Sequence, residues 1–300
     1  MRFPTRPDPP PPMRLPRSFR PLATAAALAT ALLLAACRHP GPGAPAASAA
    51  PAAPQVLLLG EVHDNAAGHA ARAALLRKQV EAGWRPAIAM EQFDTAMQPA
   101  LDAAMRECRD PGCVIARAAP GKAGWTWAYY EPVIALALQY KLPLYAANLS
   151  RADAAKVVKD GFAAALPADL IARYRLDALP AQVLAAQEEE VRGSHCGALP
   201  EALVAPMAKA QIARDVVMAE TLRVHAADGV VLIAGNGHVR RDIAVPFWLR
   251  QQGVAPRAVG FLEPGADAAA FDAVERIPAA DRPDPCAGFK APPAPPAPRG

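Results

Sequence analysis

The sequence predicts an α/β fold with a mainly parallel central sheet flanked by helices and a helical insertion in the middle of the chain. Two observations support this fold class. Short uninterrupted apolar runs, typical of strands that are buried on both faces, alternate with longer amphipathic patterns. Polar residues capable of binding or catalysis follow directly after these runs. Parallel strands would bring such residues to one edge of the sheet, where α/β folds bind their ligands.

The first 37 residues resemble the signal peptide of a bacterial lipoprotein. Residues 14–37 begin with basic side chains, continue with an apolar core and end in Leu34-Ala35-Ala36-Cys37. The apolar run is short for a membrane span, and small residues precede the cysteine. This ending resembles a lipobox, in which Cys37 is lipidated after cleavage, and Arg38 favours sorting to the outer membrane, facing the periplasm. An ordinary secretory signal with a coincidental cysteine is the alternative. Translation starts at Met1 or at Met13.

The composition divides the remainder of the chain into three parts. Residues 38–54 are rich in Pro, Ala and Gly and are predicted to be a linker between the membrane and the folded part. Residues 289–300 are rich in Pro and are predicted to be disordered. The sequence between them, residues 55–288, has a length compatible with one domain.

The charge pattern argues against a nucleic acid partner. The formal net charge of the chain is +4. Five Arg and one Asp within residues 1–37 account for all of it. A neutral mature protein has no electrostatic attraction for a polyanion.

The predicted elements follow in a regular order from residue 55. An apolar strand over 55–60 precedes an amphipathic helix with Asp64 or Asn65 as its N-cap and Gly83 as its stop. The Ala-rich region 150–228 is predicted to be helical. The other predicted strands cover residues 86–91, 142–148, 229–235 and 257–263.

The long helix predicted near residues 201–228 carries Arg214 and Asp215. Met207, Gln211, Arg214 and Met218 recur at helical spacing on one face. This spacing favours a packing face with Arg214 at its margin. The alternative places Arg214 and Asp215 at the carboxyl ends of the strands, in support of the polar residues there.

Carboxylate, imidazole and amide side chains lie at the carboxyl ends of four of the predicted strands or just beyond them. These residues are Glu61, His63, Glu91, Asn148, Asn236 and His238. Both histidines end a Gly-x-x-His sequence, and the glycines fit a sharp turn that needs positive φ. Two imidazoles and two carboxylates (Glu61, His63, Glu91 and His238) suit a divalent metal with an open position for water, or general acid and base catalysis. In the alternative interpretation, each histidine only binds loop backbone.

Aromatic residues concentrate in "GWTWAYYEP", which contains Trp125, Trp127, Tyr129 and Tyr130. Such a cluster suits the core, a dimer interface or a shelf for a planar ligand. A tyrosinate from this segment could ligate ferric haem. From the residues alone, core or interface is the favoured interpretation.

Four cysteines remain beyond Cys37, and an even number in an exported chain indicates two disulfides. An Asp-Pro-Gly turn separates Cys108 from Cys113, so this pair closes easily. Cys196 then pairs with Cys286 and ties the C-terminal segment to the body. The spacing lacks the paired CxxC pattern of a thiolate metal site.

The chain resembles the ChaN-like haem-binding lipoproteins, within a wider superfamily that includes the Tiki and TraB proteins. Seven segments carry the resemblance, in family order over about residues 57–246: "LLLGEVHDN", "AMEQF", "WAYYEPV", "AANLSR", "HCGALPEAL", "AQIARDVVMA" and "IAGNGHVRRDIAVP". The resemblance implies a role in haem or iron uptake and a homodimer that binds haem between its subunits. It also implies haem ligation by a tyrosine, for which Tyr130 is the first candidate and Tyr129 the second, with His195 as the assisting histidine.

The wider superfamily also contains metal-dependent hydrolases with Gly-x-x-His motifs. Glu61, His63, Glu91 and His238 match these motifs in residue type and order. The alternative function is therefore a periplasmic metal-dependent hydrolase that acts on peptides or esters. Hydrolytic activity is not implied for every member, so the leading hypothesis remains a haem-binding protein.

Overall fold

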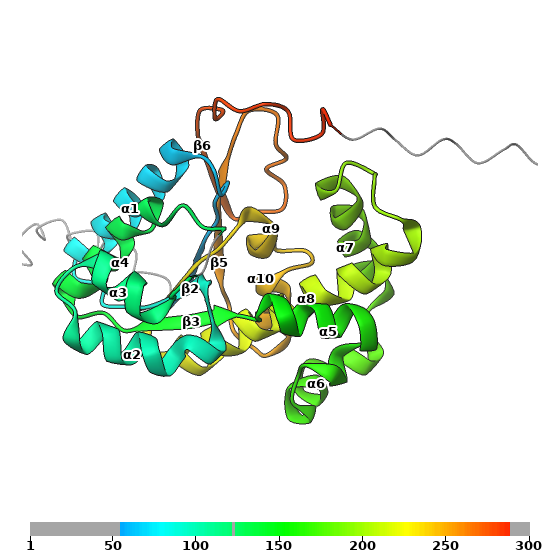
Figure 1. The fold of residues 1–300 in the computed structure, drawn as a ribbon, viewed down its shortest axis with the longest axis horizontal. Helices are drawn as coiled ribbons and strands as arrows, with labels where there is room; N and C mark the ends of the chain where they lie inside the picture. The colour runs from blue at the N-terminus through cyan, green and yellow to red at the C-terminus, as the bar shows by residue number, and fades with distance from the viewer. Residues whose placement is uncertain (1–54, 122–123, 289–300) are drawn as a thin grey trace, which may run out of the picture. The chain divides into compact units, whose positions relative to one another are not determined.

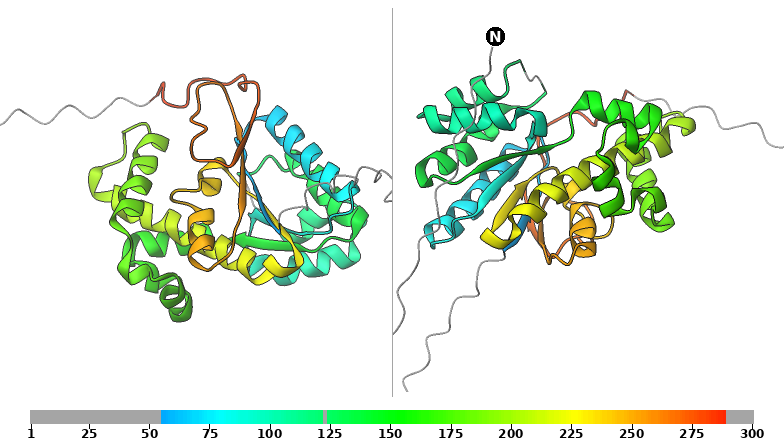
Figure 2. Two further views of the ribbon diagram at one scale, coloured as in Figure 1. Left: turned by 180° about the vertical axis from the view of Figure 1, so that it is seen from behind. Right: turned by 90° about the horizontal axis from the view of Figure 1, so that it is seen from below.

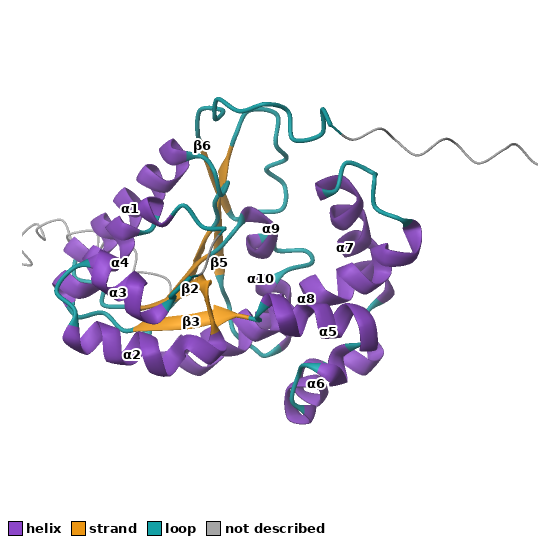
Figure 3. Cartoon of the chain, viewed as in Figure 1, coloured by secondary structure: helices purple, strands orange, loops and turns teal. Residues whose placement is uncertain are grey.

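The computed structural model describes residues 55–121 and 124–288, and this part of the chain contains a six-stranded sheet between two layers of helices (Figures 1 and 3). The strand order is β3-β2-β4-β1-β5-β6, and every paired neighbour is parallel. The predicted α/β class is confirmed. The strands are β1 (Val56–Leu59), β2 (Ala87–Asp94), β3 (Leu144–Asn148), β4 (Val230–Ile233), β5 (Arg257–Leu262) and β6 (Ala273–Arg276).

Ten α-helices and five short 3₁₀ helices surround the sheet in the described part of the chain. The α-helices are α1 (Ala66–Glu81), α2 (Gln98–Glu107), α3 (Pro111–Ala118), α4 (Glu131–Tyr140), α5 (Arg151–Asp160), α6 (Ala168–Tyr174), α7 (Ala181–Ser194), α8 (Glu201–His225), α9 (Asn236–Val239) and α10 (Val245–Gln251). The 3₁₀ helices are η1 (Thr95–Met97), η2 (Trp127–Tyr129), η3 (Phe162–Ala164), η4 (Leu176–Ala178) and η5 (Ala226–Asp228).

The alternation of side chains along the strands creates two cores. Leu57 and Leu59 of β1 pack with residues of α1, α2, α3 and α4 on one face of the sheet. Val56 and Leu58 pack with residues of α5, α8 and α10 on the other face. Because successive side chains of a strand point to opposite faces, an uninterrupted apolar strand serves both cores. Figures 1 and 2 show the two helix layers on opposite sides of the strands.

The local signals explain most of the predicted elements. Asn65, one of the two residues predicted as N-cap of α1, accepts a hydrogen bond from the Gly68 N–H at 2.8 Å. α1 ends at Glu81, and Gly83 follows with φ of +108°. All five predicted strands are present. The sixth strand, β6, has no apolar run because its side chains are partly or fully exposed at the end of the sheet.

The predicted signal peptide with Cys37, the linker 38–54 and the tail 289–300 lie outside the described residues. Their assignments remain predictions. None of the helices in the described part of the chain has the length and hydropathy needed to span a bilayer.

Both predicted cysteine pairs have their sulfur atoms at bonding distance. Cys108 and Cys113 lie five residues apart, on either side of the turn between α2 and α3. Cys196 and Cys286 lie 90 residues apart and join the α7–α8 connection to the C-terminal segment. The second pair therefore closes a much longer loop of chain.

We expect the two pairs to contribute unequally to stability. Cross-linking restricts the unfolded chain more when the closed loop is longer. Replacing Cys196 and Cys286 together by Ser should cost about 2–4 kcal/mol, and replacing Cys108 and Cys113 should cost about 2 kcal/mol or less. Urea unfolding of the two double variants under oxidising conditions measures the difference. Equal losses would contradict the loop-length argument.

Candidate functional site

The carboxyl ends of β1, β2 and β4 bring Glu61, Glu91 and the turn that begins at Gly235 to one edge of the sheet, here called the carboxyl edge. The three strands pair in register, with Leu59 and Met90 both opposite Ile233. Residues that follow the strands therefore emerge side by side. The sequence prediction that these side chains share one edge is confirmed.

Close packing explains the two Gly-x-x-His glycines. A Cβ atom on Gly235 would lie 2.9 Å from Cε1 of His63 and 3.7 Å from Oε2 of Glu91. A Cβ atom on Gly60 would overlap the side chain of Asn236. Neither glycine has positive φ, so the sequence-based explanation by turn geometry was wrong. These glycines allow the turns after β1 and β4 to touch.

Glu61 is the centre of the first polar cluster. Its Oε1 accepts hydrogen bonds from the Tyr130 hydroxyl at 2.5 Å and from Nδ1 of His63 at 2.8 Å. Its Oε2 forms an ion pair with Arg72, which is fully buried. Arg72 also donates to Nδ1 of His69 at 2.9 Å, and Nε2 of His69 donates to the His63 carbonyl at 3.1 Å. The cluster thus fixes both the position and the tautomer of two imidazoles.

His238 is the centre of the second polar cluster. Its Nδ1 lies 2.7 Å from Oδ1 of Asp215, and its Nε2 lies 3.5 Å from Oε1 of Glu91. Oε2 of Glu91 accepts the Gly235 N–H at 2.8 Å. Glu91 and Asp215 are both buried, so two carboxylates face one imidazole out of water.

Arg214 and Asn236 hold the surrounding loops. Arg214 donates to the Asn148 side chain and to the Leu149 carbonyl, both at 2.8 Å. Of the two interpretations of this helix face, the structure therefore favours the one that places Arg214 and Asp215 at the carboxyl edge. Asn236 donates to the Phe261 carbonyl at 2.7 Å and ties the turn after β4 to β5.

Sequence reasoning missed His69 and Arg72. Both lie on the buried face of α1, which also carries Leu76 and Val80 at helical spacing. A charged residue at an apolar-face position was the available signal, because a buried guanidinium needs a buried partner. Burial lowers the pKa of Arg72 to about 10, although Tyr130 and Glu91 favour its charged form.

In the second cluster, burial and neighbouring charges shift the pKa values of the titratable groups in opposite directions. Burial alone would lower the pKa of His238, but Glu91 and Asp215 outweigh it and raise the pKa. Burial also raises the pKa of Asp215 to about 6, in spite of the opposing effect of His238. The pKa of Glu91 is lowered, because the imidazoles of His238 and His63 outweigh the cost of its burial.

We expect the stability contribution of His238 to depend on pH. Its pKa is raised on folding, so the folded state binds the proton more tightly than the unfolded state does. The stabilisation is complete below the ordinary histidine pKa of about 6.5 and is lost as the pH rises through the folded value. NMR titration of the imidazole, assigned with His238→Gln, measures the shift. A pKa at or below 6.5 would contradict the proposed influence of the two carboxylates.

A cleft of about 790 Å³ opens over both clusters. The His63 side chain is 52% exposed in this region, and Trp125 packs edge-on against its ring with centroids 5.1 Å apart. When Nδ1 donates to Glu61, Nε2 of His63 carries a lone pair and can accept a proton or ligate a metal. The cleft is lined by Glu61, Val62, His63, Asp64, Gln187, Glu190, Val191, Ser194, Gln211, Gly235, Asn236, Gly237, His238, Arg282 and Pro285.

The two candidate tyrosines have different environments. Tyr130 is fully buried, and its hydroxyl donates to Glu61. Burial raises its pKa, so formation of the tyrosinate is opposed. Tyr129 is partly exposed and stacks on His69 with ring centroids 4.7 Å apart. The structure thus makes Tyr129 the more accessible candidate ligand, while either assignment stays a prediction.

His195 lies just beyond the end of α7, next to the cleft residue Ser194. Its Nδ1 lies 2.7 Å from the Val191 carbonyl, and its neighbour Cys196 pairs with Cys286. The C-terminal segment held by this pair contributes Arg282 and Pro285 to the cleft. His195 is therefore held close to the cleft wall, and its role in haem binding remains a prediction.

The four residues predicted as metal ligands form two carboxylate–imidazole pairs, Glu61 with His63 and Glu91 with His238. Within residues 55–121 and 124–288, no group of three or more His, Cys, Asp or Glu side chains is arranged to hold a metal ion. Both carboxylates also bind groups of the protein. A divalent metal at this edge therefore remains only a prediction.

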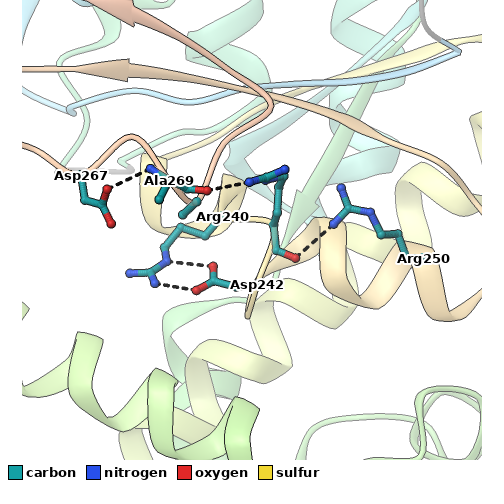
Figure 4. Close-up of a pocket in the computed structure, with 7 residues that line it drawn as sticks. Arg240, Asp242, Arg250, Asp267 and Ala269 are labelled. Carbon is teal, nitrogen blue, oxygen red and sulfur yellow. Dashed lines mark hydrogen bonds and ion pairs between the residues drawn. The ribbon is translucent and has the colours of Figure 1, made fainter.

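A second hollow, of about 400 Å³, is lined by arginines and aspartates (Figure 4). Arg240 forms an ion pair with Asp242, with its Nη2 2.7 Å from Oδ2, and also pairs with Glu190. Arg250 donates to the Arg241 carbonyl at 3.1 Å. Arg241 and Arg250 both form ion pairs with Asp272, so all three arginines that line this hollow are paired with carboxylates.

Solved structures with a related fold include ChaN of Campylobacter jejuni, whose structure is described as showing cofacial haem binding. It matches with a TM-score of 0.61 and 21% sequence identity, over 74% of this chain and 86% of that chain. A match at this identity shows that the two chains share a fold. An erythromycin esterase in an open conformation matches with a TM-score of 0.37 and 16% identity, over 71% of each chain. That TM-score is too low to bear on function. No curated protein sequence matches this chain significantly.

The model of one protein family matches residues 48–249 and is described as haem-binding uptake, Tiki superfamily, ChaN. This range covers most of the folded part, including both polar clusters and both candidate tyrosines. The resemblance inferred from the sequence is therefore confirmed. The chain belongs to the ChaN family of haem-binding uptake proteins in the Tiki superfamily.

Proposed function

We propose that this protein is a lipid-anchored haem-binding protein of the bacterial envelope that takes part in haem or iron uptake. The observation that carries the proposal is the family match over residues 48–249. The chemistry of the cleft supports it, because the half-exposed imidazole of His63, oriented by the buried carboxylate of Glu61, lies beside the ring of Trp125. Bound haem would supply a ferric iron that a tyrosinate oxygen or an imidazole nitrogen of the protein could ligate.

The partly exposed side chains around η2 are suited to this ligand. Tyr129 can supply an anionic oxygen, and Trp125 and Trp127 offer partly exposed apolar rings to a planar macrocycle. His63 and His195 are the imidazoles that can assist, by ligation or by hydrogen bonding to a propionate. Haem binding between two copies of the chain would let the aromatic side chains of both copies contribute to the site.

Titration of hemin into the purified protein tests the proposal. At micromolar protein we expect a shifted Soret band that saturates at a fixed stoichiometry. Light scattering with and without hemin measures whether binding accompanies dimer formation. A hemin spectrum identical to that of free hemin would overturn the proposed function. A monomeric hemin complex would contradict only the proposed dimer.

The lipid anchor needs its own measurement. We expect the protein recovered from bacterial membranes to begin at Cys37 and to carry the mass of attached acyl chains. Cys37→Ala should prevent that modification. A mature protein that begins elsewhere, without acyl chains, would remove the anchor and leave haem binding untouched.

A second candidate function is hydrolysis of a peptide or an ester. The observation that favours it is the pair of carboxylate–imidazole contacts around Gly235, within reach of the cleft. His63 Nε2 could accept a proton from water, and the raised pKa of His238 suits a proton donor. Metal analysis of protein purified without chelator tests the metal-dependent form. Ester and peptide turnover should then be lost in both His63→Ala and His238→Ala. Wild-type protein without turnover would exclude this candidate.

A further inference from the structure

A groove of about 510 Å³ lies between the α2–α3 turn and the end of α4, away from both polar clusters. Arg106, Arg109 and Lys141 line it and are exposed. Partly buried apolar side chains, including Met105 and Leu138, form the rest of its wall. The groove therefore combines cations with apolar surface, as a phosphate group attached to an apolar body requires.

The three cations of the groove are not neutralised by the protein. In the described part of the chain, none of Arg106, Arg109 and Lys141 has a carboxylate within ion-pair distance. The one acidic residue in the groove wall is Asp110, whose Oδ1 accepts the Cys113 N–H at 2.9 Å as the N-cap of α3. A local excess of positive charge remains. This distinguishes the groove from the arginine-lined hollow of Figure 4.

The positive surface continues onto the end of α1. Nη1 of Arg77 donates to Oε1 of Gln139, another groove residue, at 3.5 Å. The guanidinium of Arg85 lies over the Tyr140 ring, 4.9 Å from its centroid. We call Arg77, Arg85, Arg106, Arg109 and Lys141 together the basic edge. Glu81 lies 3.7 Å from Arg77 and offsets part of this charge.

The basic edge lies at the amino ends of the strands. α1, α2 and α4 end near it, and β2 and β3 begin just after Arg85 and Lys141. The described chain also enters the sheet on this side, because β1 begins at Val56 and all paired strands are parallel. Val56, the first residue of β1, therefore lies at the same edge as Arg85 and Lys141. The cleft opens at the opposite, carboxyl ends of the strands.

We propose that the basic edge docks on a bilayer that carries anionic phospholipids and binds their phosphate groups. We choose a bilayer as the partner because of the lipid anchor proposed above. The structure supplies the positive charges of the basic edge, which complement anionic headgroups. Each Lys or Arg close to an anionic bilayer raises the partition coefficient about fivefold. Docking in this orientation turns the cleft away from the membrane and toward water.

Vesicle partition of the unlipidated chain tests the proposal. We use the chain from residue 38 onward, which carries neither the apolar leader nor an acyl chain, and vesicles of phosphatidylcholine with or without phosphatidylglycerol. We expect sedimentation with the phosphatidylglycerol vesicles, weakened by salt. Replacing Arg106 and Arg109 by Gln and Lys141 by Asn should weaken partition about a hundredfold. Asn suits position 141 because its φ is +54°.

A matched control removes the same charge elsewhere. Lys156, Lys159 and Lys209, on α5 and α8, are replaced together by Gln. Partition of this control should stay within about threefold of the parent. Far-ultraviolet circular dichroism shows whether both triple variants are folded. If the groove variant does not fold, Arg109→Glu alone should weaken partition at least about fivefold. Equal partition of the two triple variants, or binding without a preference for phosphatidylglycerol, would overturn the proposal. Neither outcome depends on acylation or haem, so failure of this proposal can be distinguished from failure of the proposed function.

Discussion

Arg72→Met is expected to lower the free energy of unfolding by about 3–5 kcal/mol. Arg72 has no exposed surface, and Glu61, its ion-pair partner, is 3% exposed. Removing the guanidinium leaves a carboxylate buried without its counter-charge. The remaining donors, His63 and Tyr130, both bind Oε1 of Glu61, so Oε2 loses the partner that Arg72 supplied. Urea unfolding followed by circular dichroism measures the loss.

The partner of the ion pair provides the decisive comparison. Glu61→Gln together with Arg72→Met removes both charges, so this double variant should recover most of the loss of the single variant. Arg77→Met, on the exposed side of the same helix, should cost less than about 1 kcal/mol. An Arg72→Met protein as stable as Arg77→Met would show that the buried pair does not hold the first cluster together.

Tyr129→Phe is expected to abolish the ferric tyrosinate spectrum and to weaken hemin binding at least about tenfold. Tyr129 is partly exposed beside the cluster, whereas the Tyr130 hydroxyl is buried and occupied by Glu61. Ligation by Tyr130 would require both the loss of that hydrogen bond and ionisation against a raised pKa. Absorption and electron paramagnetic resonance spectra of the hemin complexes measure the ligand.

Tyr130→Phe is the matched variant at the neighbouring position. We expect it to retain the tyrosinate spectrum and to lose about 1–3 kcal/mol of stability, because Glu61 loses a buried donor. The family resemblance placed Tyr130 first, so the two variants compare that assignment with accessibility. Loss of the spectrum in Tyr130→Phe, with Tyr129→Phe unchanged, would restore the assignment to Tyr130 and require a rearrangement of the first cluster on binding.

The carboxyl edge could be predicted because it depends on local pattern and one topological rule. Apolar runs marked five strands, and parallel strands necessarily end at the same side of the sheet. The glycines of the two Gly-x-x-His sequences were also recognisable, although their reason was misjudged. Their backbone needs no positive φ, and the contact of Gly235 with His63 joins residues distant in sequence. A pairwise contact of this kind has no local signature.

The sequence by itself determined the fold class, the common edge of Glu61, His63, Glu91 and His238, and membership of the family. These follow from periodicity, strand order and ordered motifs. Only the tertiary structure decided that Arg72 lies beneath Glu61, that Asp215 faces His238 and that adjacent Tyr129 and Tyr130 differ in exposure. The reason is physical. Burial and partner choice arise when separate helices pack against the sheet, and neighbouring residues with the same side chain then experience different solvent and charge.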